Sequence, residues 1–180
     1  MHMDYISLII GNDHHNTLGV VESLGQKGIH SHLIIVGNIK ESYVSKSKYV
    51  DQVFYAKDCI DMIDVLLKNY SKSGKKCIVV ATCDDIAMEL NNRLNELSSF
   101  CKLPGIPIAG LLKKNMNKQS MTILAQNIGL TVPKTLIFQK GGILPENIPI
   151  PCITKSIVSA GYGKVDLNVF YSLDSIKDFL

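Results

Sequence analysis

The 180-residue chain contains 46% hydrophobic and 19% charged residues, and its formal net charge at pH 7 is +3. This aliphatic content argues against a disordered chain, and the small charge, spread along the sequence, argues against nucleic-acid binding. No apolar run approaches the ~18 residues of a membrane span, and no apolar signal stretch opens the chain. We therefore predict a cytoplasmic α/β protein, long enough for one domain and part of another.

The five cysteines show neither a CxxC pair nor the spacing of a zinc site. Cys77, Cys101 and Cys152 lie in or beside apolar runs. The sequence therefore predicts buried, reduced thiols at these three positions.

The first hundred residues alternate strand and helix patterns. Short apolar runs predict strands at residues 5–10, 32–36, 53–55 and 77–81. Helical spacing predicts a helix that begins at Asn16 or Thr17 and stops near Gly28, a short helix within 38–50, a helix over 59–70, and one from Asp84 or Asp85 to Leu97. This alternation predicts right-handed βαβ units and a Rossmann-like, mainly parallel sheet.

The alternation of strand and helix patterns stops near residues 103–112, where prolines and glycines interrupt regular structure. We expect one domain over residues 1–110 and a second over 111–180. In the second, apolar spacing predicts a helix that ends at Gly129 and a final helix from about Ser172. Extended runs are expected at 135–138, 152–155 and 168–171, and a loop at 139–151.

Polar residues follow the first and the fourth predicted strands. In an open parallel sheet, ligands bind beyond the carboxyl ends of the strands where the strand order reverses. Helix capping is the alternative explanation for the same residues. The adjacent His14 and His15 should point in different directions, so we predict no metal site and assign no catalytic residue. The candidate substrate-binding residues are Asn12, Asp13, Asn16, Thr17 and Asp84.

Two lysines of the second half are suited to phosphate binding. Lys118 opens a helix, and Lys155 ends an apolar strand and precedes a loop of small residues, 156–164. Glycines let a backbone approach an anion closely, so the arrangement suits a polyphosphate. Ordinary surface lysines are the alternative. The sequence has no GxGxxG after the first strand, and Val165 replaces the Ser or Thr of a Walker loop.

Several segments resemble the ATP-grasp superfamily. Residues 117–121 (NKQSM) and 129–135 (GLTVPKT) resemble the entry into its ATP-binding domain, 151–155 (PCITK) its strand with the second ATP-contacting lysine, and 156–164 its glycine-rich loop. Residues 16–19 (NTLG), 23–25 (SLG) and 45–50 (SKSKYV) resemble the preceding domain of carboxylate–amine ligases, distant relatives of the carbamoyl-phosphate synthase large chain and of biotin carboxylase. The family often has a proline after the lysine, where this chain has Ser156.

The resemblance implies a pre-ATP-grasp domain followed by the beginning of an ATP-grasp domain. It implies that Lys118 and Lys155 contact ATP, and that Ser159, Gly161 and Gly163 close over the γ-phosphate as a lid. It implies ATP and Mg²⁺ as cofactors of the complete enzyme and a small carboxylate and an amine as substrates. The family's metal ligands come later than residue 180, so we expect the chain to be inactive alone, with weak ATP affinity.

Two other functions share the first hundred residues. One is a stand-alone Rossmann-like module that binds a nucleotide or metabolite without turnover. The other is the N-terminal half of a sugar-nucleotide glycosyltransferase, although that class gives no reason for the VPKT phrase at 132–135. An uncovered apolar surface in residues 139–180 would also favour self-association, so a homodimer is a further expectation.

Overall fold

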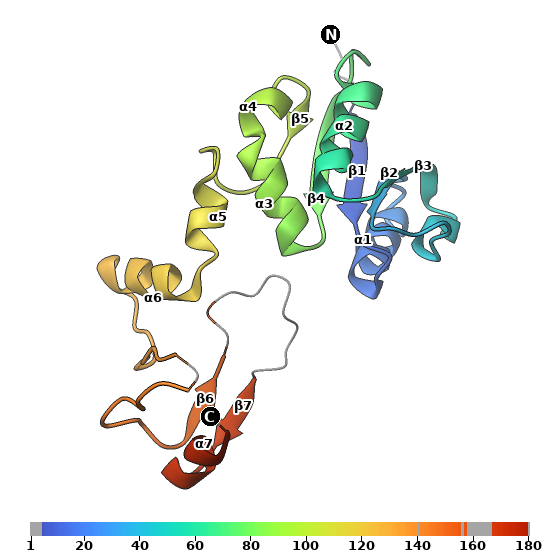
Figure 1. The fold of residues 1–180 in the computed structure, drawn as a ribbon. Helices are drawn as coiled ribbons and strands as arrows, with labels where there is room; N and C mark the ends of the chain where they lie inside the picture. The colour runs from blue at the N-terminus through green and yellow to red at the C-terminus, as the bar shows by residue number, and fades with distance from the viewer. Residues whose placement is uncertain (1–4, 140, 156, 158–166, 180) are drawn as a thin grey trace. The chain divides into compact units, whose positions relative to one another are not determined.

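The computed structural model describes residues 5–139, 141–155, 157 and 167–179. They form two compact units, residues 1–113 and 114–180, the first of which holds the larger sheet (Figure 1). No helix among the described residues is long and apolar enough to cross a bilayer.

The first unit is built on a five-stranded parallel sheet with the order β3-β2-β1-β4-β5. The predicted parallel α/β fold is thus confirmed. The strands and helices of this unit are β1 (Tyr5–Gly11), α1 (His15–Gly25), β2 (Ser31–Val36), η1 (Val44–Lys46), β3 (Val50–Ala56), α2 (Cys59–Tyr70), β4 (Lys76–Ala81), α3 (Asp84–Asn92), α4 (Leu94–Leu97), β5 (Cys101–Lys102) and α5 (Leu111–Asn115).

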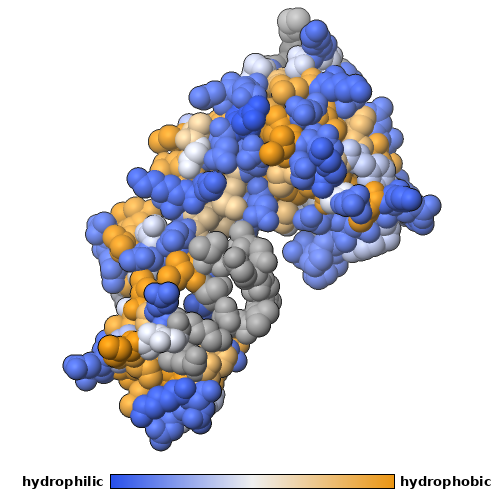
Figure 2. All heavy atoms as spheres, in the orientation of Figure 1, coloured by the Kyte–Doolittle hydropathy of each residue, from blue (hydrophilic) through white to orange (hydrophobic). Residues whose placement is uncertain are grey.

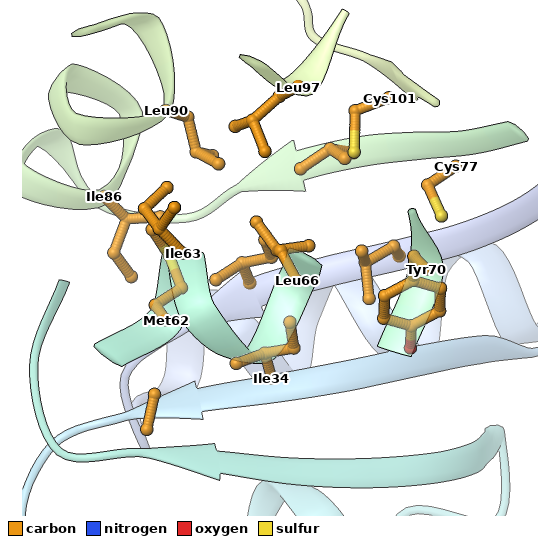
Figure 3. Close-up of a cluster of buried hydrophobic side chains, with 14 of the residues drawn as sticks. Ile34, Met62, Ile63, Leu66, Tyr70, Cys77, Ile86, Leu90, Leu97 and Cys101 are labelled. Atoms are coloured by element: carbon orange, nitrogen blue, oxygen red, sulfur yellow. The ribbon is translucent and has the colours of Figure 1, made fainter. Parts of the chain in front are cut away.

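Helices cover both faces of this sheet, because alternate strand residues point to opposite sides. In β1, Ile9 packs in a cluster with α1, whereas Leu8 and Ile10 join the larger cluster under α2, α3 and α4. Figure 3 shows the larger cluster, in which Met62 and Leu66 of α2 pack over the strands. Continuous apolar strands are what a sheet buried on both faces requires.

Two details of the first unit differ from the sequence-based expectation. The predicted helix from Asp84 to Leu97 is broken at Arg93. The carbonyl of Asn91 accepts from the Gly110 amide at 3.3 Å, so it is not used in a continuing helix. Strand β5 was not predicted, because two residues carry too little pattern and its pairing with β4 is a tertiary contact.

The second unit contains α6 (Lys118–Asn127), an antiparallel pair of β6 (Cys152–Thr154) and β7 (Asn168–Phe170), and α7 (Leu173–Phe179). Gly129 has φ +80° and ends α6 as predicted, whereas the predicted extended run 135–138 forms no strand. Cys152 is half-buried, not buried as predicted.

Apolar side chains remain exposed on the second unit, and Figure 2 shows several on its visible surface. Its buried hydrophobic residues are Phe170 and Ile176, whereas Ile153, Val169 and Tyr171 are each more than half exposed. The predicted homodimer stays a prediction.

Candidate functional site

The predicted substrate residues lie at the point where the strand order of the sheet reverses. From β1 the chain passes to β2 and β3 on one side, and then returns to β4 on the other side of β1. The loops that follow β1 and β4 therefore flank the crevice where open α/β sheets bind ligands. Asn12 and Asp13 lie in the first of these loops, Asn16 and Thr17 in the first turn of α1, and Asp84 at the start of α3.

Thr17 has a structural position within this group. Its side chain is fully buried, and its hydroxyl donates to the Asn12 carbonyl at 2.7 Å. The same hydroxyl lies 2.8 Å from that of Thr82, which follows β4. A β-carbon on Gly11 would fall 2.1 Å from the Thr82 hydroxyl oxygen and 2.3 Å from that of Thr17. Thr17 therefore holds the two loops together, and its hydroxyl is turned away from solvent.

Asp13 is engaged with the loop between β2 and β3. Its carboxylate accepts hydrogen bonds from the Ser42 hydroxyl at 2.5 Å and from the amides of Tyr43 and Val44 at 3.3 and 3.2 Å. Desolvation raises the pKa of Asp13, but these hydrogen bonds and the nearby Lys46 charge outweigh it and hold the pKa below its ordinary value. Asp13 is thus an ionised anchor for that loop.

Asn12, Asn16 and Asp84 are exposed and leave polar side chains at the crevice. Asn12 also donates from Nδ2 to the Val36 carbonyl at 2.9 Å, which fixes the first loop to the end of β2. Asp84 lies in the first turn of α3, where a carboxylate is favourable whether or not a ligand binds. These three residues remain predictions as substrate contacts.

The beginning of α1 corrects two expectations. His14, not Asn16 or Thr17, is the N-cap, because its Nδ1 accepts from the Asn16 amide at 3.2 Å. The rings of His14 and His15 do not point apart, since their centroids are 3.8 Å apart at an interplanar angle of 38°. His15 and Asn16 also line a groove of about 510 Å³ beside β4. The other residues along this groove are Gly19, Val20, Ser23, Leu24 and Val80.

Two segments that carry the family resemblance meet on α1. A β-carbon on Gly25 would lie 2.0 Å from the ring of Tyr49, so the glycine is required for this close approach. The Ser47 hydroxyl donates to the Glu22 carboxylate at 2.6 Å in the same contact. Residues 23–25 and 45–50 are therefore parts of one packing interface.

In the second unit, a hydrogen bond joins the two lysine-bearing segments. The backbone amide of Lys118, the first residue of α6, donates to the Ile157 carbonyl at 3.3 Å. Lys155 lies two residues before Ile157, directly after β6, and is exposed. The Asn117 side chain caps α6, because its Oδ1 accepts hydrogen bonds from the amides of Gln119 and Ser120 at 2.9 and 3.3 Å. The start of α6 and the end of β6 are thus neighbours, although they are far apart in sequence.

Ser159, Gly161 and Gly163, the predicted lid residues, lie outside the described residues. Two amines from neighbouring backbone segments suit the phosphates of ATP. The described residues contain no group of three or more His, Cys, Asp or Glu side chains that could hold a metal ion.

Sequence reasoning missed three residues that shape these regions. Thr82 and Ser42 bind Thr17 and Asp13, and neither carries a pattern that reveals a long-range partner. Asn91 is 6% exposed, and its side chain bonds the backbone of Ile106, Ile108 and Leu112. Asn91 could have been suspected from the sequence. Asparagine is unfavourable inside a helix, so its presence there indicates that its side chain makes a specific hydrogen bond.

No protein-family model matches the chain, and no curated protein matches it. Among solved structures, it is similar to the L-amino acid ligase from Bacillus licheniformis, with a TM-score of 0.66 and 14% sequence identity over 99% of this chain and 42% of that chain. It is also similar to the phosphoribosylaminoimidazole carboxylase ATPase subunit from Aquifex aeolicus, with a TM-score of 0.40 and 12% identity over 72% of this chain and 33% of that chain.

The chain thus spans less than half of the ligase that it matches. The matched part is the N-terminal region of the ligase chain. At 14% identity the similarity concerns the fold. The fold implied by the sequence resemblance is confirmed: the chain has the fold of the N-terminal part of the L-amino acid ligase.

Proposed function

We propose that this chain is the front part of a cytoplasmic ATP-dependent ligase. The enzyme activates a carboxylate as an acyl-phosphate and joins it to an amine or a similar nucleophile. Residues 1–110 take up a small-molecule substrate, and residues 111–180 hold the phosphates of ATP. We expect these residues to be inactive alone, because catalysis needs carboxylate oxygens that hold Mg²⁺ near the phosphates and the described residues show no cluster of three or more metal ligands.

The observation that carries the proposal is the bond from the Lys118 amide to the Ile157 carbonyl. It brings the backbone segments that carry the two lysines together within one compact unit, which supports a shared polyphosphate site. A single lysine at a strand end is common on protein surfaces. Two amines from segments joined by backbone hydrogen bonding can neutralise adjacent phosphates, and each charge-assisted contact favours binding.

The exposed face of the β6–β7 pair supplies a second support. Ile153 and Val169 are opposite each other in the antiparallel register, and both are more than half exposed. Side-chain alternation along β6 would place Lys155 on the same side as Ile153. An apolar surface beside an amine suits a ligand with a flat, weakly polar base and a charged tail.

The first unit supports uptake of a small polar substrate. Asn12, Asn16 and Asp84 offer amide and carboxylate groups at the reversal of strand order, and Thr17 and Asp13 fix the loops that carry them. Amides can donate to a carboxylate, and Asp84 can pair with an ammonium group. This combination suits an amino acid or a similar zwitterion.

An NMR titration of the isotope-labelled chain with ATP tests the proposal. We expect weak binding, with the largest amide shifts at Lys118, Lys155 and Ile157. Lys155→Ala should weaken the affinity about tenfold. The matched control is Lys134→Ala, an exposed lysine of the same unit whose Nζ bonds the Asn147 carbonyl, and it should change the affinity less than twofold.

Two results would contradict the proposal. In the first, ATP shifts no resonance of the second unit at millimolar concentration. In the second, the amide shifts occur instead at residues 72–76, a segment of the first unit with three lysines, and the Lys155 and Lys134 variants have the same affinity. Tight, Mg²⁺-dependent binding would overturn the expectation that the chain lacks a complete site.

A stand-alone binding module is the second candidate function, and the completeness of the first unit favours it. The five-stranded sheet has a buried cluster on each face and needs no further strand to close its core. Such a module would bind a metabolite at the crevice with an affinity that is the same when Lys118 and Lys155 are both replaced by alanine.

A further inference from the structure

Two cysteines lie directly opposite each other on neighbouring strands. Cys77 of β4 and Cys101 of β5 are partners in the parallel register, and both side chains are buried, with exposed fractions of 0% and 4%. Register partners in a parallel pair point to the same face of the sheet. Figure 3 shows both sulfur atoms on the side that faces Tyr70.

This arrangement meets the distance requirement for a disulfide. Neighbouring strands are about 4.8 Å apart, and the α-carbons of a disulfide are usually ~4.4–6.8 Å apart. The other cysteines are placed differently. Cys59 and Cys83 stand at the beginnings of α2 and α3, and Cys152 belongs to the second unit. None of these three is the register partner of another described cysteine.

Strand β5 is the part of the sheet that can expose this pair. It is two residues long, lies at the edge, and pairs with β4 alone. Short edge elements open locally far more often than a whole domain unfolds. Opening of β5 would bring Cys101 to solvent while Cys77 stays in the sheet. The neighbouring Cys77 thiol and burial raise the pKa of the Cys101 thiol in the closed sheet, so reaction requires the open state.

We propose that Cys77 and Cys101 form a reversible intrachain disulfide that fastens β5 to β4 under oxidising conditions. In the open state, the Cys101 thiolate attacks a low-molecular-weight disulfide and releases one thiol. The Cys77 thiol then loses its proton and displaces the second thiol from Cys101. One disulfide is consumed, two thiols are released, and the protein loses two hydrogens.

The disulfide would act at the end of β5, where residues 103–112 begin. We call this segment the connector. Residues 103–110 follow β5 directly, and α3 and α4 lie inside the loop that the disulfide closes. Oxidation would suppress the opening of β5 and hold the beginning of the connector in place. This inference concerns the first unit alone and does not depend on the ligase proposal.

Mass spectrometry of the oxidised full chain tests the inference. The chain is incubated with oxidised glutathione, free thiols are alkylated after unfolding, and the protein is cut with trypsin. Cleavage after Lys76, Arg93 and Lys102 gives the peptides 77–93 and 94–102. We expect these two peptides linked, with the unfolding midpoint raised by roughly 5–10 °C.

Cys83 lies on the same peptide as Cys77, so a Cys83→Ser variant is the matched control and should give the same linked pair. Cys101→Ser should lose both the linkage and the shift in the midpoint. The inference is overturned if Cys77 and Cys101 are fully alkylated after prolonged oxidation. Linkage through Cys83, or stable glutathione on Cys101 without ring closure, would overturn it too.

Discussion

The hydroxyl oxygens of Thr17 and Thr82 lie 2.8 Å apart, in the space that a side chain on Gly11 would occupy. Gly11 ends β1, Thr17 belongs to α1, and Thr82 follows β4, so three elements meet at one point. This contact closes the base of the crevice between the loops after β1 and β4. Whatever binds there meets loops that are already held in place, which lowers the entropy cost of binding.

Gly11→Ala should therefore destabilise the protein. The new methyl group would lie 2.1 Å from the Thr82 hydroxyl oxygen and would separate the two threonines. We expect a loss of about 2–3 kcal/mol in the free energy of unfolding, measured by urea denaturation. The control is Gly19→Ala in the exposed middle of α1, where nothing lies within 4 Å, and it should add about 0.5–1 kcal/mol. Equal stability of the two variants would refute the steric argument.

Asn91→Ala should release the connector from α3. The side chain donates to the carbonyls of Ile106 and Ile108 at 2.9 and 3.2 Å and accepts from the Leu112 amide at 3.0 Å. Removal leaves the partly buried carbonyl of Ile106 and amide of Leu112 without their partner, at a cost of about 1–2 kcal/mol. Limited proteolysis should then cut residues 103–112 at least about tenfold faster, because cleavage follows the open population.

Asn92→Ala is the matched control for Asn91→Ala. Its Nδ2 bonds only the Glu89 carboxylate, at 3.3 Å, one turn earlier in the helix. We expect a change within about 0.5 kcal/mol and an unaltered proteolytic pattern. If both variants are cut at the same rate, Asn91 does not anchor the connector.

Local pattern was sufficient for most of the first unit. Residues 59–70 were predicted as a helix with the observed bounds, and the strands were located because apolar runs buried on both faces leave a strong signal. The segments that carry Lys118 and Lys155 were selected because their sequences resemble those of a known superfamily. Their role in binding stays a prediction.

The contacts that the sequence did not predict join residues that are far apart in the chain. The partners of Thr17 and Asp13 are Thr82 and Ser42, which follow other strands, and no local pattern connects them. Arg93 interrupts a helix that is regular in sequence, because Asn91 is needed by the connector. Such contacts depend on the tertiary fold and override local propensity.

His32 should make the protein less stable in mild acid. Its Nδ1 lies 2.9 Å from the Tyr70 hydroxyl, and desolvation lowers the pKa of the imidazole below its ordinary value of 6.5. The unfolded chain therefore binds a proton first, and stability is lost as the pH falls from about 6.5 toward the folded pKa. The change should be below about 1 kcal/mol, since His32 is only partly buried.

Urea unfolding at pH 7.5 and 5.5 measures this effect, and NMR titration of the imidazole resonances measures the pKa. A His32→Gln variant should lose most of the difference between the two pH values. The exposed His30, which pairs with Asp51 at 3.0 Å, provides the control in His30→Gln. A His32 resonance that titrates above 6.5 would show that burial does not dominate.

Asp13 should also make the protein less stable in acid, but at a lower pH than His32, because it is a carboxylate. Its carboxylate is held ionised by the Ser42 hydroxyl and two backbone amides, so the folded pKa lies below the ordinary value of 3.8. Stability from this group is present above that value and is lost as the pH falls through the folded pKa. Asp13→Asn keeps the shape but removes the charge, and at pH 7 it should cost about 1 kcal/mol, as for a helix-capping carboxylate.

The pH dependence separates this role of Asp13 from a general packing defect. The difference between the wild type and Asp13→Asn should shrink as the wild-type carboxylate takes up its proton, because the two side chains are then both neutral. Asp64→Asn, on the exposed side of α2, should cost less than about 0.5 kcal/mol at every pH. A cost for Asp13→Asn that is the same at pH 7 and at pH 2.5 would mean that the charge is not what anchors the loop, and that the amide alone disturbs the contacts with Tyr43 and Val44.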